Sequence, residues 1–188
     1  MIPILITGFG SFEGVDENPS GALARRFDGQ GPVRGAVLPV EFRASAEDLD
    51  AALASGPEPS LILCLGVHPG PGYRLERRAG PTLGLERPDN VGECGDVVSG
   101  EMGGPEGDLV TSLDLDELLE ALSSGGADGV CISEDAGGYV CERVYRHALV
   151  RASERGSEAL FFHVPPLAEV SIEAQAEVLH SLLATLGV

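Results

Sequence analysis

The sequence contains no lysine, so all 12 of its basic residues are arginine. An arginine side chain stays charged, and it therefore forms no Schiff base and serves as no general base. The missing lysine excludes enzymes that depend on a lysine nucleophile or base, and nucleotide-binding proteins with a P-loop lysine. The 12 cations face 30 acidic residues, which leaves a net charge of -18. No basic patch is expected, so neither nucleic acid nor a membrane surface is an expected partner.

Long apolar runs are also missing. No stretch reaches the roughly 20 apolar residues of a membrane span, and no charged region precedes a cleavable apolar stretch at the amino terminus. We therefore expect a chain that begins at Met1 and a cytoplasmic location. With 188 residues, 43% of them hydrophobic, the chain is long enough for a sizeable core. We expect one domain over residues 1–188.

The spacing of the four cysteines does not indicate a metal site. None of the four belongs to a C-x-x-C pair or has a ligand-like spacing to histidine, so no metal is expected. Cys64 in LILCLG and Cys131 in GVCIS stand in apolar, strand-like runs, which predicts that both are buried. Cys94 lies in a glycine-rich loop and indicates nothing. Cys141 has a different setting.

Short apolar runs alternate with amphipathic ones, as in an α/β domain. We expect a sheet of at least five mostly parallel strands joined by helical crossovers, and Pro39 indicates an edge strand. The expected strands cover 3–9, 35–40, 61–66, 128–133 and 158–164. The expected helices cover 19–28 and 44–54, a segment capped by Asp114 and closed by Gly125, a segment that starts around Tyr139, and a segment from Ile172 to Leu186.

Residues 67–109 depart from this pattern. They are rich in glycine, proline and charge, show little periodicity, and exceed the length of a typical connector. Such a segment is either functional or disordered. LERRAG and ERPDN are too charged to be buried without partners, which favours a functional loop.

The segment ISEDAGGYVCERVYRH, residues 132–147, joins an expected strand to an expected helix. The helix starts around Tyr139, so Cys141 falls in its first turn, after a bend that glycine permits. The backbone N–H groups there have no intrahelical acceptor, and they would lower the pKa of the thiol or hold an oxyanion. The alternative is that Cys141 packs against the sheet, as free cysteines commonly do.

A nucleophilic thiol also needs a base. His163 in ALFFHVPP stands at the carboxyl end of the 158–164 strand, the edge where α/β sheets bind ligands. A lone histidine after three apolar residues also fits a structural role. Many acidic residues qualify as the carboxylate that orients the imidazole, and residue pattern alone does not choose among them.

The motifs AGGYVCE and FFHVP, with ITGFGSF and NPS near the start, resemble the pyroglutamyl peptidase I family, also called pyrrolidone-carboxylate peptidases. They occur in order from Thr7 to Pro165. The resemblance implies a three-layer α/β/α sandwich with a mostly parallel central sheet that can be mixed. It implies a cysteine peptidase that removes an amino-terminal pyroglutamate from peptides and needs no metal or cofactor. Since the family is often oligomeric, a homo-oligomer is also expected.

The resemblance also assigns roles to particular residues. Carried over one by one, the nucleophile is Cys141, the general base is His163, and the orienting acid is Glu76 in RLERRAG. The early loop TGFGSF places Phe9 and Phe12 beside the pyrrolidone ring. Ordinary hydrophobic core is the alternative role of both phenylalanines.

The segment LERPDN departs from the family. The family usually has an arginine, implicated beside the oxyanion site, where this sequence has Glu86, and Arg87 follows one step later. We expect Arg87 to turn into the site, because an uncompensated carboxylate beside an oxyanion is doubly unfavourable. We expect Tyr139 and Val140, just before the nucleophile, to contact the substrate as well.

The residues around Cys141 also differ from those usual in the family. Neutral residues usual in the family are replaced by Glu134, Asp135, Glu142 and Arg143. Extra negative charge would raise the pKa of Cys141. An alternative function is therefore that of a homologue of the same fold with weak or altered activity on another N-acyl or lactam substrate. A non-catalytic interaction protein is a more distant class, and no feature speaks for it.

Overall fold

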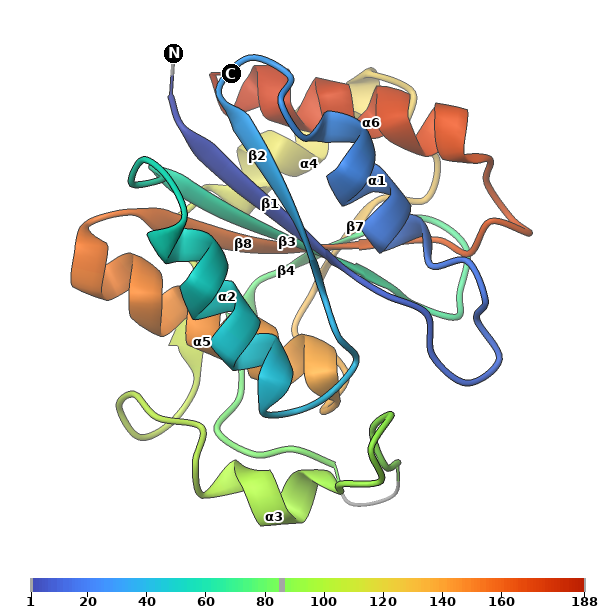
Figure 1. Ribbon diagram of the computed structural model, residues 1–188. Helices are drawn as coiled ribbons and strands as arrows, with labels where there is room; N and C mark the ends of the chain where they lie inside the picture. The colour runs from blue at the N-terminus through green and yellow to red at the C-terminus, as the bar shows by residue number, and fades with distance from the viewer. Residues whose placement is uncertain (1, 85–86, 188) are drawn as a thin grey trace.

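The computed structural model describes residues 2–84 and 87–187 of the chain. A six-stranded sheet in the order β2-β1-β3-β8-β4-β7 forms its centre (Figure 1). Strands β2, β1, β3 and β8 are parallel, β4 is antiparallel to β8, and β7 is parallel to β4. The sheet is therefore mixed and mostly parallel. The strands are β1 (Ile4–Phe9), β2 (Val33–Leu38), β3 (Leu61–Val67), β4 (Arg74–Glu76), β7 (Cys131–Ser133) and β8 (Glu158–Val164).

Helices cover both faces of the sheet, and each face has its own hydrophobic core. On one face lie α1 (Pro19–Phe27), α4 (Leu115–Ser124) and α6 (Ile172–Thr185), and on the other lie α2 (Ala44–Ala54) and α5 (Val140–Arg155) (Figure 1). This is the expected three-layer α/β/α sandwich. Every residue of β1 is buried, which explains why its sequence is a continuous apolar run rather than an alternating one.

Local signals set the helix ends. Asn18 caps α1 by accepting a hydrogen bond from the Ser20 N–H, and Pro19 follows at the first helical position. Asp114 caps α4 by accepting from two backbone N–H groups, and α4 ends at Gly125. Both ends of α4 were predicted from the sequence and are confirmed.

The sheet edges differ from the predictions in detail. Strand β2 is an edge strand as expected, but it ends at Leu38, so that Pro39 stands just outside it. The expected 128–133 strand shortens to β7, which forms the opposite edge. Cys131 is exposed there, so the prediction that it is buried was wrong; Cys64 in the central strand β3 is buried as predicted.

The segment 67–109, expected to be an irregular loop, contains short elements. It holds β4, β5 (Arg78–Ala79) and α3 (Gly95–Ser99), and β5 pairs with β6 (Leu109–Val110). Strand β4 inserts between β8 and β7 and is part of the main sheet. A strand of three residues is too short to show a period of two, which is why the sequence did not predict it.

Two buried arginines of α5 hold the loop 102–107, between α3 and β6, in place. Arg143 donates to the carbonyl oxygen of Met102 at 3.2 Å. Arg146 donates to the carbonyl oxygens of Gly103, at 3.2 Å, and Gly107, at 2.8 Å. The helix that begins beside Cys141 therefore also anchors this loop. In the part of the chain that the structure describes, no helix is long and apolar enough to cross a membrane.

Candidate active site

Strand pairing brings Glu76 and His163 together. Strand β4 runs antiparallel to β8 with Glu76 opposite Phe161, so Glu76 and His163 are diagonal neighbours on one face of the sheet. The distance from His163 Nδ1 to Glu76 Oε1 is 2.7 Å, and both side chains are buried. Because a carboxylate accepts, Nδ1 carries the hydrogen and donates it. The other ring nitrogen, Nε2, is then the one that can act as a base.

The rest of Glu76 is also enclosed. Its main-chain carbonyl accepts from the hydroxyl of Tyr145 at 2.8 Å. Its second carboxylate oxygen, Oε2, is buried and has no hydrogen-bond partner among the described residues. A buried carboxylate costs free energy unless it is paired, so the bond to His163 matters for both groups.

Cys141 lies against the neighbouring strand β3. It is the second residue of α5, where the backbone N–H groups still lack intrahelical acceptors. A Cβ atom placed on Gly66 would lie 3.0 Å from Cys141 Sγ, and Gly66 pairs in register with His163. The absent side chain at position 66 lets the sulfur approach β3 beside the strand that carries His163.

The thiol of Cys141 is hard to ionise in this environment. Burial raises its pKa to about 12, and the charges of Glu76 and Glu142 act in the same direction. The backbone N–H contribution at the helix start lowers this pKa, as predicted, but burial outweighs it and the net shift is upward. The expected effect of Glu142 does have the predicted sign. The raised pKa favours the thiol over the thiolate in this environment.

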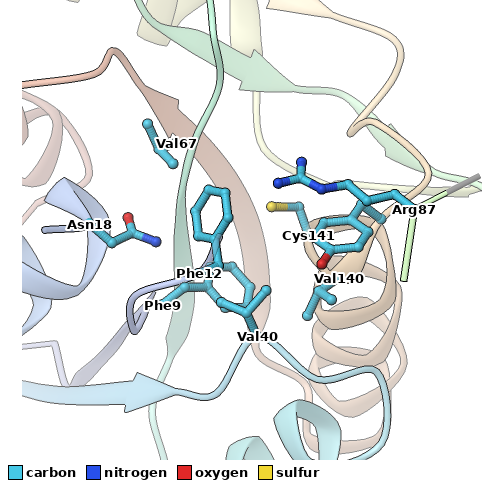
Figure 2. A pocket seen from close by; sticks show the side chains of 9 residues that line it. Phe9, Phe12, Asn18, Val40, Val67, Arg87, Val140 and Cys141 are labelled. Atoms are coloured by element: carbon cyan, nitrogen blue, oxygen red, sulfur yellow. The ribbon is translucent and has the colours of Figure 1, made fainter. Parts of the chain in front are cut away.

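A small pocket opens beside the sulfur (Figure 2). Its volume is about 50 Å³, room for a few water molecules. All five residues predicted to contact substrate line it together with Cys141: Phe9, Phe12, Arg87, Tyr139 and Val140. Asn18, Val40 and Val67 also line it and were not predicted. Phe9 is at the same time part of the hydrophobic core, so its two expected roles coexist.

Comparison with known proteins identifies the family of the whole chain. The sequence profile of the pyroglutamyl peptidase family matches residues 2–186. The chain belongs to this family. A pyrrolidone-carboxylate peptidase from Deinococcus radiodurans is 34% identical over 186 residues, which cover 94% of this chain and 84% of that protein. Another, from Halalkalibacterium halodurans, is 30% identical over 179 residues, which cover 90% and 87% of the two chains.

Solved structures show the same fold. The pyrrolidone carboxyl peptidase of Fervidobacterium islandicum superposes with a TM-score of 0.89 at 28% identity, covering 100% of this chain and 99% of that one. A mutant pyrrolidone carboxyl peptidase from Pyrococcus furiosus superposes with a TM-score of 0.87 at 26% identity, covering 98% and 97%. The likeness extends over whole chains rather than over the site alone.

Arg87 occupies the pocket wall in this member of the pyroglutamyl peptidase family. Its guanidinium carbon lies 5.1 Å from the centre of the Phe12 ring and 4.7 Å from that of Tyr139, distances at which a cation is attracted to an aromatic face. Figure 2 shows the guanidinium and the sulfur of Cys141 both pointing into the pocket. Glu86, the other residue expected to matter here, lies outside the described residues.

Glu142, which the sequence predicted only as a nearby charge, holds the bend before the nucleophile. Its buried carboxylate accepts from the backbone N–H groups of Gly80 and Gly138. Burial raises the pKa of this carboxyl, and those two N–H groups act against the rise. Glu142 is the third residue of α5, from where a side chain can reach back to the backbone before the helix, and the sequence interpretation missed this position as a signal.

No described group of three or more histidine, cysteine, aspartate or glutamate side chains is arranged to hold a metal ion.

Proposed function

We propose that this chain removes an amino-terminal pyroglutamyl residue from peptides, with Cys141 as nucleophile, His163 as general base and Glu76 as the acid that orients the imidazole. The observation that carries the proposal is the 2.7 Å contact between Glu76 and His163. His163 lies on β8 and pairs in register with Gly66 of β3, and the sulfur of Cys141 lies against Gly66. The pocket beside the sulfur is lined by Cys141 and by all five residues predicted to contact the substrate. Membership of the pyroglutamyl peptidase family supports the same activity.

The reaction follows from these positions. His163 Nε2 takes the proton from the Cys141 thiol while the sulfur attacks the pyroglutamyl carbonyl, and the backbone N–H groups at the start of α5 stabilise the oxyanion. His163 then returns the proton to the leaving amine, which breaks the peptide bond and leaves an acyl-enzyme. Water, deprotonated by His163, hydrolyses that thioester. Because the pKa of the thiol is raised, proton transfer accompanies the attack rather than preceding it.

Selectivity for pyroglutamate follows from the absence of charge on its ring. Apart from Asn18, Arg87 and Cys141, the pocket is lined by aromatic and aliphatic side chains, among them Phe9, Val40 and Val67. A neutral lactam enters such a pocket without losing the hydration of a charge. An ordinary amino terminus would lose it, because its ammonium group is charged.

The competing function is weak or altered activity on another N-acyl or lactam substrate. The raised pKa of Cys141 favours it, since a thiol that is hard to deprotonate is a poorer nucleophile. The cytoplasmic location, the homo-oligomer and the single-domain organisation stay predictions.

Hydrolysis of a pyroglutamyl amide with a neutral fluorogenic leaving group tests the proposal. We expect Cys141→Ala and His163→Ala each to lower kcat by roughly 10⁴-fold or more, and Glu76→Gln to lower it less, because it orients the imidazole without making or breaking bonds. Cys131→Ala is the matched control, since Cys131 is exposed on the edge strand β7. Near-normal kcat in a folded His163→Ala variant would disprove the catalytic roles. Turnover of an acetyl or other lactam amide in place of the pyroglutamyl amide would favour the competing function.

A further inference from the structure

A second cavity adjoins the pocket beside Cys141. It measures about 400 Å³, against about 50 Å³ for the pocket, and both are lined by Phe12, Val67 and Arg87. His68, which follows β3, and Pro166, which follows β8, form part of its wall. A pyroglutamyl ring in the small pocket would leave this larger space free.

The position of the cavity relative to His163 indicates what enters it. The ring of His68 lies edge-on to that of His163, with 5.9 Å between the ring centres. In the proposed reaction His163 donates a proton to the leaving amine, so the residue that follows pyroglutamate has to pass close to His163. The cavity that reaches this side of the site is therefore placed to receive the leaving part of the peptide.

His68 contributes shape rather than charge to the cavity. Its Nδ1 accepts from the Gly70 N–H at 3.1 Å, and its Nε2 donates to the Gly72 carbonyl oxygen at 3.0 Å. Since one nitrogen accepts and the other donates, the ring is neutral. Burial also lowers its pKa.

The wall of the second cavity carries more acidic than basic side chains. Glu13 and Glu17, from the loop between β1 and α1, line it and are exposed to solvent. Among the described residues, Arg87 is the one arginine that lines the cavity, and its guanidinium already lies over two aromatic rings. Apolar neighbours such as Val15 and Leu167 offer contact surface to an aliphatic stem.

We propose that this cavity is the subsite for the residue after pyroglutamate, and that Glu13 and Glu17 make the chain prefer a basic side chain there. The inference rests on the proposed function and names the substrate class within it. An arginine or lysine would pack its methylene groups against the apolar wall and place its charge beside the carboxylates, whereas a glutamate would be repelled. Exposed ion pairs each contribute little, so we expect kcat/KM for a basic peptide to exceed that for an acidic one by about fivefold to tenfold.

Three matched peptides test the preference: pyroglutamyl peptides with arginine, glutamine or glutamate at the second position, otherwise identical and amidated at the carboxyl terminus. We expect kcat/KM to rank arginine above glutamine above glutamate at low salt. The ratio should shrink at about 0.5 M NaCl, because salt screens exposed charges. The double variant Glu13→Gln, Glu17→Gln should bring the arginine-to-glutamate ratio close to one.

The control variant is Glu120→Gln, Glu177→Gln, which removes the same charge from the exposed surfaces of α4 and α6 and should keep the ratio. Equal kcat/KM for the arginine and glutamate peptides would overturn the subsite while leaving the proposed function intact. Loss of the ratio in the control variant would also overturn it, because the preference would then come from net charge. No hydrolysis of any peptide or of the fluorogenic amide would overturn the proposed function, and the subsite with it.

Discussion

Gly66→Ala tests the geometry of the site with one methyl group. The new Cβ would lie 2.8 Å from two ring atoms of Phe161 and 3.0 Å from Cys141 Sγ. Carbon contacts in well-packed interiors have their optimum near 3.5–4.0 Å, so both neighbours would have to move. Phe161 is fully buried in the core between the sheet and α5 and has little room to shift. The sulfur, at the end of a shorter side chain, is expected to be displaced from β3 and hence from His163.

The size of the effect follows from these distances. Overpacking a well-filled core by a methyl group costs about 1–3 kcal/mol, which for a chain of this size lowers Tm by roughly 2–12 °C. A shift of about 1 Å in a reacting atom lowers the rate by about 10²-fold. We therefore expect Gly66→Ala to lower kcat on a pyroglutamyl amide by about 10²-fold while the protein stays folded at room temperature.

Two measurements separate displacement of the sulfur from general instability. Gly100→Ala is the matched control, because a Cβ there meets nothing within 4 Å and the φ of -66° suits any residue. Iodoacetamide labelling followed by mass mapping reports on Cys141 directly, with the exposed Cys131 as internal reference. If Gly66→Ala kept kcat and Tm within error of the parent chain, the sulfur would not lie against β3 and the proposed arrangement would be refuted.

Two further substitutions probe the charges of the site. Glu142→Gln removes a negative charge that raises the pKa of Cys141, so this pKa should fall. The rate of Cys141 alkylation at about pH 8 should then rise a few-fold, because the pH profile of alkylation moves to lower pH. An unmoved profile would show that the charge of Glu142 does not act on the thiol. Arg87→Ala should lower kcat by about 10²-fold if the guanidinium stabilises the oxyanion. A change confined to KM would instead show that Arg87 is only part of the pocket wall.

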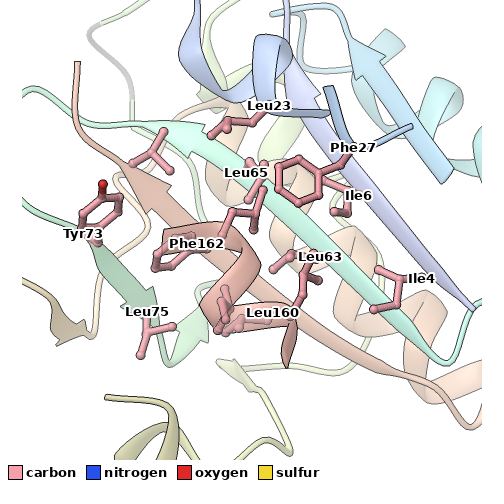
Figure 3. Packing of buried hydrophobic residues seen from close by; sticks show 14 of the residues in the cluster. Ile4, Ile6, Leu23, Phe27, Leu63, Leu65, Tyr73, Leu75, Leu160 and Phe162 are labelled. Carbon is pink, nitrogen blue, oxygen red and sulfur yellow. The ribbon is translucent and has the colours of Figure 1, made fainter. Parts of the chain in front are cut away.

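The layered fold was predictable because the residues that form its core stand in the sequence as apolar runs, one for each buried strand. Ile4 and Ile6 of β1 lie on the same face as Leu63 and Leu65 of β3, and on β8 Phe162 continues that cluster (Figure 3). Apolar runs of this length that alternate with amphipathic segments leave few arrangements other than a sheet covered on both faces. The apolar residues that recur on one face of the expected helices predicted that these helices pack against the same sheet.

The position of Glu76 was not predictable from local pattern. Strand β4 has three residues, and it joins the sheet antiparallel to β8. Neither feature leaves a periodic signal, and its pairing depends on neighbours that lie far away in the chain. The resemblance to a family pointed to Glu76, whereas residue pattern alone left every carboxylate as a candidate. The edge position of Cys131 was hidden for the same reason.

The pKa of Cys141 shows how a local effect yields to a tertiary one. The start of a helix is visible in the sequence, and it stabilises a nearby anion by about 0.3–1 kcal/mol. Burial against β3 is not visible there, because it depends on Gly66 in a distant segment. Burial is the largest contribution to the pKa of this thiol and acts in the opposite direction, so the pKa is raised on balance.

The same burial is compatible with catalysis when charge develops only during the reaction. In the proposed mechanism the thiol keeps its proton until the attack, and the neutral lactam adds no charge to the pocket. Attack creates an imidazolium beside Glu76 and an oxyanion beside the N–H groups of α5, so each new charge forms next to a group of opposite polarity. Oε1 of Glu76, which accepts from His163 Nδ1, then pairs with the imidazolium. A buried carboxylate that costs stability in the resting protein thereby stabilises the transition state, where the free energy determines the rate.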